Sequence, residues 1–339
     1  MKSIKFIIVI IIVLSFVGKS YGQVGLNKLA QSTMNFLLVS TSAKSSAMGD
    51  AFFTLGTGAE SMFYNPAGLV ESSKTFDITL NYTQWIADIK YLSGGVSYNM
   101  GNLGSVGVSF LTVDYGTINA TRLDPSLISG SGNVVGYIDD GALSNVGAYS
   151  VGLSYAKAIS TKFLIGGTAH IAGQNLGQNV FDDGSIHKNN AVKVAFDAGV
   201  KYYTGWKNFA FGMAIRNFSS NIRREREDEQ LPLTFTMGGA ISISDFINPD
   251  KSKDHNWTLA VDFLHSNNYS ERVNIGTSYQ YMQMITLRAG YQTNRDIASW
   301  SAGIGFNTSI SDYDMEVNYS FSKMNTFDSV SRISLNFGF

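Results

Sequence analysis

From Phe76 to Phe339 the chain alternates apolar residues with small or polar ones, in segments of about ten residues that end in turns. Alternation with period two is typical of a β-strand with one apolar face. Strands of soluble proteins usually hold about five or six residues, whereas membrane-spanning barrel strands need about 9–11. We count about fourteen segments, an even number as single-chain barrels require. The pattern therefore predicts an all-β membrane protein, an antiparallel transmembrane β-barrel of about fourteen strands over residues 75–339.

The two faces of these segments predict which side chains meet lipid. Val261 lies on the apolar parity and is expected to face lipid, whereas Ser278 lies on the opposite parity and is expected to face the lumen. A charge against hydrocarbon costs about 2–4 kcal/mol at the bilayer midplane. A soluble β-sandwich, which would bury the apolar face, is the alternative, and strand length favours the membrane. The ionisable residues expected in the lumen are Asp77, His170, Lys193, Asp197, Lys201, Arg216, Asp262, Arg288 and Glu316.

The links between segments also alternate in length through the first half of the chain. Residues 99–104 form a short link, as a periplasmic turn should. Residues 116–145, 174–190 and 218–231 are predicted to be long external loops. Residues 244–256 break the rule, because this link is long where a short turn is expected.

The first 22 residues are predicted to be a secretory signal peptide. Lys2 and Lys5 precede an apolar run over residues 7–14, and Ser20 and Gly22 are small residues at the cleavage-determining positions. The alternative is a membrane anchor, but the apolar run is shorter than the roughly 20 residues that a spanning helix needs.

Composition agrees with a membrane barrel. Charged residues make up 15% of the 339 residues, below the roughly 25% of soluble domains. The net charge of -1 gives no broad basic surface, so no nucleic-acid partner is expected. Cysteine is absent, which excludes thiolate catalysis and cysteine-based zinc sites. Outer-membrane lipid is the partner that the pattern predicts first.

Residues 23–74 lack the period-two pattern and are predicted to be a plug, or hatch, inside the barrel. Irregular backbone at membrane depth is allowed only where protein or water surrounds it. A periplasmic extension is the alternative. Asn65-Pro66 is a turn-initiating dipeptide, and this role needs no ligand. The plug motif, to which we assign a structural role, comprises Met48, Gly49, Asp50, Asn65, Pro66, Ala67 and Gly68.

These motifs carry a resemblance to a known family. The stretches 35–39 (Asn-Phe-Leu-Leu-Val), 45–51 (around Met-Gly-Asp) and 65–68 (Asn-Pro-Ala-Gly) resemble the start of the PorV/PorQ family. That family belongs to the FadL-like group of fourteen-stranded outer-membrane barrels with an N-terminal hatch. The resemblance implies the bacterial outer membrane, and its best-known members serve the type IX secretion system. It also implies that the aromatic end of the last strand, Phe337 and Phe339, is the assembly signal.

No enzyme signature, cofactor site or metal site is expected. His170 is the one histidine that parity places in the lumen, and a lone wall histidine is usually a hydrogen-bonded structural residue. The acidic turns 139–141 and 182–185 lack the spaced ligands of a calcium loop. Residues 223–229 mix both charges and are predicted to form a solvated external tip.

Two functions follow as hypotheses. The first, favoured by the family motifs, is a secretion-system barrel that binds the translocon or the C-terminal domains of secreted cargo. The alternative, favoured by the combination of plug and barrel, is a FadL-like channel for uptake of hydrophobic small molecules. An apolar pocket between hatch and wall would favour the channel. An apolar rim on the external loops would favour protein docking.

Overall fold

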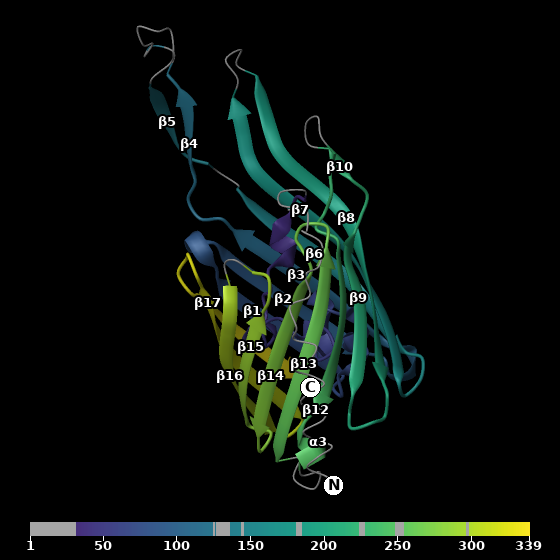
Figure 1. Cartoon of the computed structure of the whole chain (residues 1–339). Coiled ribbons are helices and arrows are strands. Elements are labelled where there is room, and N and C mark those ends of the chain that lie inside the picture. The colour runs from purple at the N-terminus through teal and green to yellow at the C-terminus, as the bar shows by residue number, and fades with distance from the viewer. Residues whose placement is uncertain are drawn as a thin grey trace.

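The computed structural model describes residues 32–124, 126, 136–143, 146–180, 185–223, 228–247, 254–295 and 298–339 (Figure 1). The predicted signal peptide, residues 1–22, lies outside the described residues. No helix in the described ranges is both long enough and apolar enough to span a bilayer.

The wall is a closed antiparallel barrel of fourteen strands, as the alternation predicts. The last strand pairs with the first, with Leu335 opposite Leu80, which closes the ring and leaves no free sheet edge. The wall strands are β1 (Phe76–Gln84), β2 (Lys90–Asn99), β3 (Ser105–Asp114), β6 (Gly147–Ala158), β7 (Phe163–Val180), β8 (Ile186–Tyr203), β9 (Ala210–Phe218), β12 (Thr234–Ser242), β13 (His255–Ser266), β14 (Arg272–Tyr281), β15 (Ile285–Gln292), β16 (Ala298–Ile310), β17 (Tyr313–Met324) and β18 (Val330–Gly338).

The predicted facing of the strands is confirmed. Val108 and Leu153 are more than half exposed on the outside of the wall, whereas Lys201 and Asp262 are completely buried inside it. Trp85 and Tyr91 pack inside the lumen, where Tyr91 is buried. The outer surface of the wall therefore carries an apolar belt, and Lys201 and Asp262 are enclosed.

This facing makes the cost of a new charge depend on its side of the wall. Val261→Arg should lower the free energy of unfolding by about 2–4 kcal/mol, because the guanidinium would face hydrocarbon. Ser278→Arg should cost less, since its side chain faces the lumen. Urea titrations in lipid vesicles measure both values. Equal losses for the two variants would contradict the assigned facing.

Two wall strands continue past the barrel on the external side. The prediction that residues 174–190 form a loop is wrong, because β7 continues to Val180 and β8 begins at Ile186. Lys188 still pairs with Gln178 there. Hydrophobic alternation ends where the lipid ends, but backbone hydrogen bonding does not, so the ladder persists with polar residues on both faces.

The other long external links hold short hairpins of their own. Within 116–145, β4 (Asn119–Leu123) pairs with β5 (Tyr137–Ala142), and this hairpin rises beside the extension of β7 and β8 (Figure 1). Within 218–231, β10 (Ile222–Arg223) pairs with β11 (Asp228–Glu229). The tip of the charged segment, residues 224–227, lies outside the described residues.

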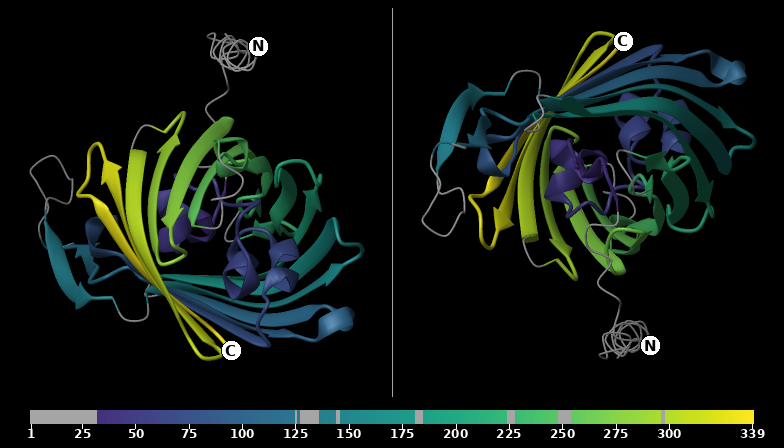
Figure 2. Two further views of the ribbon diagram at one scale, coloured as in Figure 1. Left: turned by 90° about the horizontal axis from the view of Figure 1, so that it is seen from below. Right: turned by 90° about the horizontal axis from the view of Figure 1, so that it is seen from above.

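The segment before β1 fills the inside of the ring, and we call residues 32–75 the hatch. Figure 2 shows its short helices enclosed by the wall strands in both end views. Helix α2 (Ala43–Ala47) contacts β15 to β18, η2 (Gly58–Phe63) contacts β1 to β3, and η3 (Pro66–Glu71) contacts β6 to β8. The hatch helices are η1 (Asn35–Leu38), α2 (Ala43–Ala47), η2 (Gly58–Phe63) and η3 (Pro66–Glu71); η4 (Ile86–Asp88), η5 (Gly101–Leu103) and α3 (Ser244–Ile247) lie in links between strands.

Candidate functional site

The first half of the plug motif rests on glycines of the wall. Ser42 caps α2 by accepting hydrogen bonds from the backbone N–H groups of the first turn, and Met48 is the C-cap residue after Ala47. A Cβ on Gly290 would lie 2.0 Å from the Gly49 nitrogen, and a Cβ on Gly276 would lie 2.4 Å from the Met48 carbonyl oxygen. Only glycine at these wall positions lets the hatch backbone come so close.

The second half of the motif is seated in the same way on the opposite wall. The Asn65 side chain caps η3 by accepting from the Ala67 N–H at 3.1 Å, and its amide donates to the Val200 carbonyl, also at 3.1 Å. A Cβ on Gly199 would lie 2.0 Å from Asn65 Oδ1, and a Cβ on Gly166 would lie 2.5 Å from the Pro66 backbone. The plug motif residues Met48, Gly49, Asn65 and Pro66 therefore contact the wall directly.

A charge network fastens α2 to the wall beside β17. Lys44 lies 2.7 Å from Glu60 of the hatch and 2.8 Å from Glu316 of the wall. Arg288 donates to the other oxygen of Glu316 at 3.2 Å. Burial alone would lower the pKa of Lys44, but the carboxylates of Glu316 and Glu60 raise it above its ordinary value. Each of these four charges thus has an opposite partner, as low dielectric requires.

A second cluster fastens the end of the hatch to β8. Lys201 is completely buried and donates to the Gly56 carbonyl at 2.6 Å and to Glu71. Tyr203 donates to the other oxygen of Glu71. These two charged clusters therefore hold the hatch on different sides of the ring.

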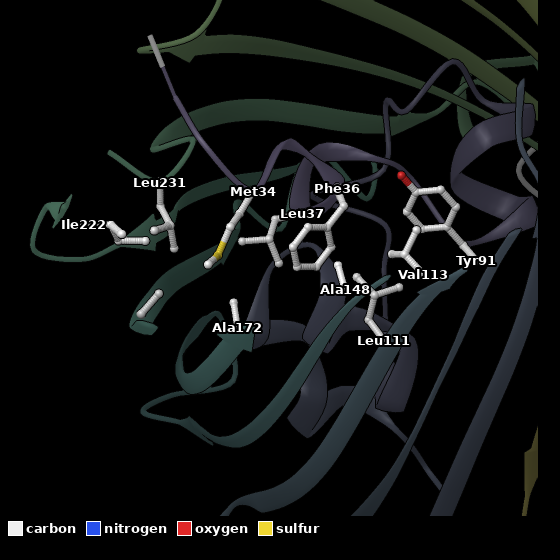
Figure 3. Packing of buried hydrophobic residues seen from close by; sticks show 11 residues of the cluster. Met34, Phe36, Leu37, Tyr91, Leu111, Val113, Ala148, Ala172, Ile222 and Leu231 are labelled. Carbon is white, nitrogen blue, oxygen red and sulfur yellow. The ribbon is translucent and has the colours of Figure 1, made fainter. Parts of the chain in front are cut away.

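The external side of the lumen contains an apolar layer, which departs from the polar interior usual in such barrels. Figure 3 shows Met34, Phe36 and Leu37 of the hatch between two groups of residues, Ile222 and Leu231 on one side and Leu111 and Val113 of β3 on the other. The alternation pattern alone did not predict apolar wall residues in the lumen. The signal was available, because β3 carries apolar residues on both of its faces. The layer comprises Met34, Phe36, Leu37, Tyr91, Leu111, Val113, Ala148, Ala172, Ala195, Ile222 and Leu231.

Two cavities lie on either side of the hatch centre. A cavity of about 50 Å³ adjoins the apolar layer. Its lining mixes apolar residues with polar and charged ones: Leu37, Met62 and Leu111 with Ser109, Asp197 and Arg216, among others. A much larger cavity of about 1090 Å³ opens at the other end, beside Lys74 and the β14–β15 turn. In the described structure the hatch separates the apolar external side from this wide polar vestibule.

His170 lies in the lumen wall beside Asp197. It is buried, and its Nδ1 lies 3.6 Å from Asp197 Oδ2. Asp197 also accepts the Asn217 N–H at 2.7 Å. In the described part of the chain no group of three or more His, Asp or Glu residues is placed to hold a metal. Residues 182–184 of one acidic turn lie outside the described residues, and in the other Asp139 accepts the Gly141 N–H at 2.8 Å.

The aromatic end of the chain is built into the closing pair of strands. Phe339 exchanges two backbone hydrogen bonds with Phe76, and the two rings stack with centroids 5.3 Å apart. Phe337 lies opposite Ile78. Both residues lie at the pairing of β1 with β18, which closes the barrel.

Deleting Phe339 is expected to lower the fraction of protein inserted in the outer membrane, because the deletion removes the last pair of β1–β18 hydrogen bonds and the ring stack. Membrane fractionation and heat-modifiable gel mobility measure that fraction. Export should not change, which the processed protein in the periplasm would report. Normal insertion of the shortened chain would rule out Phe339 as part of an assembly signal.

No family model matches the chain, and no curated protein matches it. Solved structures do. The toluene transporter TodX of Pseudomonas putida has 13% identity and a TM-score of 0.56, covering 87% of this chain and 96% of its own. The toluene transporter TbuX of Ralstonia pickettii has 13% identity, a TM-score of 0.55 and coverage of 87% and 97%. A Pseudomonas aeruginosa FadL homologue has 13% identity, a TM-score of 0.53 and coverage of 88% and 98%. The chain is a bacterial outer-membrane β-barrel in fold, with fourteen antiparallel strands in the architecture that these transporters share.

Proposed function

We propose that the protein is an outer-membrane channel for small hydrophobic molecules, closed by its hatch. The observation that carries this proposal is the apolar layer inside the lumen. A water-filled pore needs polar walls, whereas Leu111 and Val113 face inward and meet Phe36 and Leu37 of the hatch. Binding sites for hydrophobic ligands are lined mainly by apolar and aromatic side chains. The similarity in fold to toluene transporters and to a FadL homologue supports the same proposal.

The layer also indicates a direction of movement. A hydrophobic molecule entering from outside would reach the layer in which Phe36 and Leu37 of the hatch pack with Leu111 of the wall. Beyond the hatch lies the vestibule of about 1090 Å³, whose lining includes Glu71, Lys74 and Asp77. Passage therefore requires part of the hatch to shift away from the wall.

Flux of a neutral aromatic compound such as toluene into proteoliposomes tests the proposal. Leu111→Gln keeps the side-chain size but adds an amide to the apolar layer, and it should lower the rate several-fold. Ser278→Gln, on the polar wall, is the matched control and should not change the rate. A wild-type barrel that gives no flux above empty liposomes would contradict the channel proposal.

Secretion is the second candidate, and the external extension favours it. The β4–β5 hairpin and the ends of β7 and β8 rise beyond the rest of the wall, where a partner could dock. The finer resemblance to the PorV/PorQ family belongs to this candidate, and the structural neighbours fit the channel better. Removing residues 116–145 should then stop co-purification of translocon or cargo while leaving the barrel folded. Normal secretion in that strain would exclude this candidate.

A further inference from the structure

The link after β12 is long where a short periplasmic turn is expected, and its described part holds the helix α3 (Ser244–Ile247). Figure 1 shows α3 at the end of the barrel opposite the β4–β5 hairpin. Two side chains of this helix, Phe246 and Ile247, are 46% and 67% exposed. Joining two strands does not require exposed apolar side chains, so these two indicate a contact outside the chain itself.

Helix α3 packs against the neighbouring turn between β8 and β9. The rings of Trp206 and Phe246 meet edge to face, with centroids 5.6 Å apart. Lys207 donates to the Asp245 carbonyl at 2.8 Å, and Asn208 donates to the Asp245 carboxylate at 2.7 Å. The two links are thus fixed to each other, and Trp206 remains 58% exposed. We call the three exposed side chains Trp206, Phe246 and Ile247 the rim patch.

The joined links continue the two-sided pattern of the wall. Asn208 and Asp245 line the polar vestibule, whereas the residues of the rim patch do not. The exposed Tyr202 of β8 and Trp257 of β13 carry the outer apolar belt to within a few residues of the patch. The rim patch is therefore continuous with the lipid-facing surface rather than with the lumen.

Two lysines beside the rim patch donate to neutral backbone groups. Lys162, in the turn between β6 and β7, donates to the Thr204 carbonyl at 3.5 Å. Lys207 lies 5.4 Å from the centroid of the Phe246 ring, and its acceptor is the Asp245 carbonyl. These acceptors are carbonyl oxygens, so the bonds do not neutralise either ammonium charge.

This combination of groups is typical of a membrane–water interface. Tryptophan is enriched there, with its ring at the level of the lipid headgroups. Lysine side chains near the boundary place their apolar stems against lipid and their ammonium groups among the headgroups. An ammonium group also binds phosphate as a point charge. The rim patch and its two lysines thus match the upper acyl chain and the phosphate of a phospholipid.

We propose that the rim patch anchors the periplasmic end of the barrel in the membrane by binding an anionic phospholipid. Phe246 and Ile247 would contact the acyl chains, and Trp206 would lie at the headgroup boundary. Lys162 and Lys207 would bind the phosphate. The inference goes beyond the proposed channel, because it does not depend on what crosses the lumen.

Quenching of Trp206 fluorescence in proteoliposomes tests the insertion. The chain has four tryptophans, and the triple variant Trp85→Phe, Trp257→Phe, Trp300→Phe leaves Trp206 as the only one. Brominated acyl chains should lower its emission at least twofold, whereas acrylamide in the water should have little effect. If heat-modifiable gel mobility shows that the triple variant does not fold, the difference in quenching between wild type and Trp206→Phe gives the same readout.

The same measurement tests the role of the two lysines. The vesicles hold equal amounts of phosphatidylglycerol and phosphatidylcholine, with one lipid brominated at a time. Brominated phosphatidylglycerol should quench Trp206 at least twofold more than brominated phosphatidylcholine, and added salt should reduce this preference. Lys162→Gln with Lys207→Gln should remove the preference but not the quenching. Lys90→Gln with Lys323→Gln removes two exposed lysines from the external side, and the preference should remain.

Quenching by acrylamide but not by brominated chains would overturn the anchor, because the rim patch would then face water or a docked periplasmic protein. Equal quenching by the two brominated lipids would overturn the anionic headgroup, as would a preference that survives loss of both lysines. Toluene flux enters none of these readouts. Failure of the anchor therefore leaves the channel proposal standing, and absence of flux leaves the anchor standing.

Discussion

Replacing Gly290 with alanine is expected to unseat the hatch. The new Cβ would lie 2.0 Å from the Gly49 nitrogen and 2.1 Å from the Met48 carbonyl carbon. Both are backbone atoms, so no side-chain rotation can relieve the overlap. Overpacking of this kind costs about 1–3 kcal/mol, and the hatch can avoid it only by moving away from β15. Liposome swelling should therefore show faster entry of a small sugar, and the urea midpoint in lipid vesicles should fall.

Gly167→Ala is the matched control for this experiment. Gly167 also lies in a wall strand, but a Cβ there would meet only one carbonyl oxygen at the ordinary distance of 3.4 Å. Sugar entry and unfolding should remain at wild-type values in this variant. If Gly290→Ala behaved like Gly167→Ala, the wall glycines would not be the seat of the plug motif.

Lys201→Met should destabilise the protein more than any exposed substitution. The ammonium group is fully buried and holds both the Gly56 carbonyl and Glu71. Removing one partner of a buried ion pair leaves the other charge uncompensated and costs about 3–5 kcal/mol. The free energy of unfolding in lipid vesicles should fall by about this amount, and the end of the hatch should become accessible to protease.

The pair can be separated from general damage to β8 by a double variant. Adding Glu71→Gln removes the uncompensated carboxylate, so Lys201→Met with Glu71→Gln should be more stable than Lys201→Met alone. Lys157→Met, at an outward position near a short turn, controls for loss of a lysine and should have little effect. A double variant with the summed loss of both single variants would show that the two charges do not interact.

The barrel was predictable because lipid imposes a strict rule on each strand. Val108 and Leu153 lie on one parity and Lys201 and Asp262 on the other, and no nearby contact can reverse this arrangement without placing a charge in hydrocarbon. Outside the lipid this alternation is no longer required, and the sequence no longer predicts where the strands end. The sequence predicts a loop over residues 174–190 because polar residues on both faces resemble a loop, although the backbone pairing continues there.

The contacts of the hatch could not be predicted from sequence in the same way. The Met-Gly-Asp and Asn-Pro-Ala-Gly motifs contain residues that contact the wall. Their partners could not be found from the motifs, because Met48 and Asn65 contact glycines more than 100 positions away. A glycine in a strand can mark a bend or a close approach, and the sequence does not say which. Lys44 and Glu316 are 272 residues apart, so their pairing depends on how the ring closes.

The placement of α2 has a consequence for how the chain folds. This helix lies near the beginning of the chain, yet it binds β16, β17 and β18 at the end, with the Ala43 N–H donating to Ser334 at 2.8 Å. Contacts of such high sequence separation form slowly, because the intervening chain must first be ordered. Helix α2 therefore has no final partners until β16, β17 and β18 have formed. Completion of the wall and docking of α2 are then a single late event in folding, and a mutation in either one should slow the other.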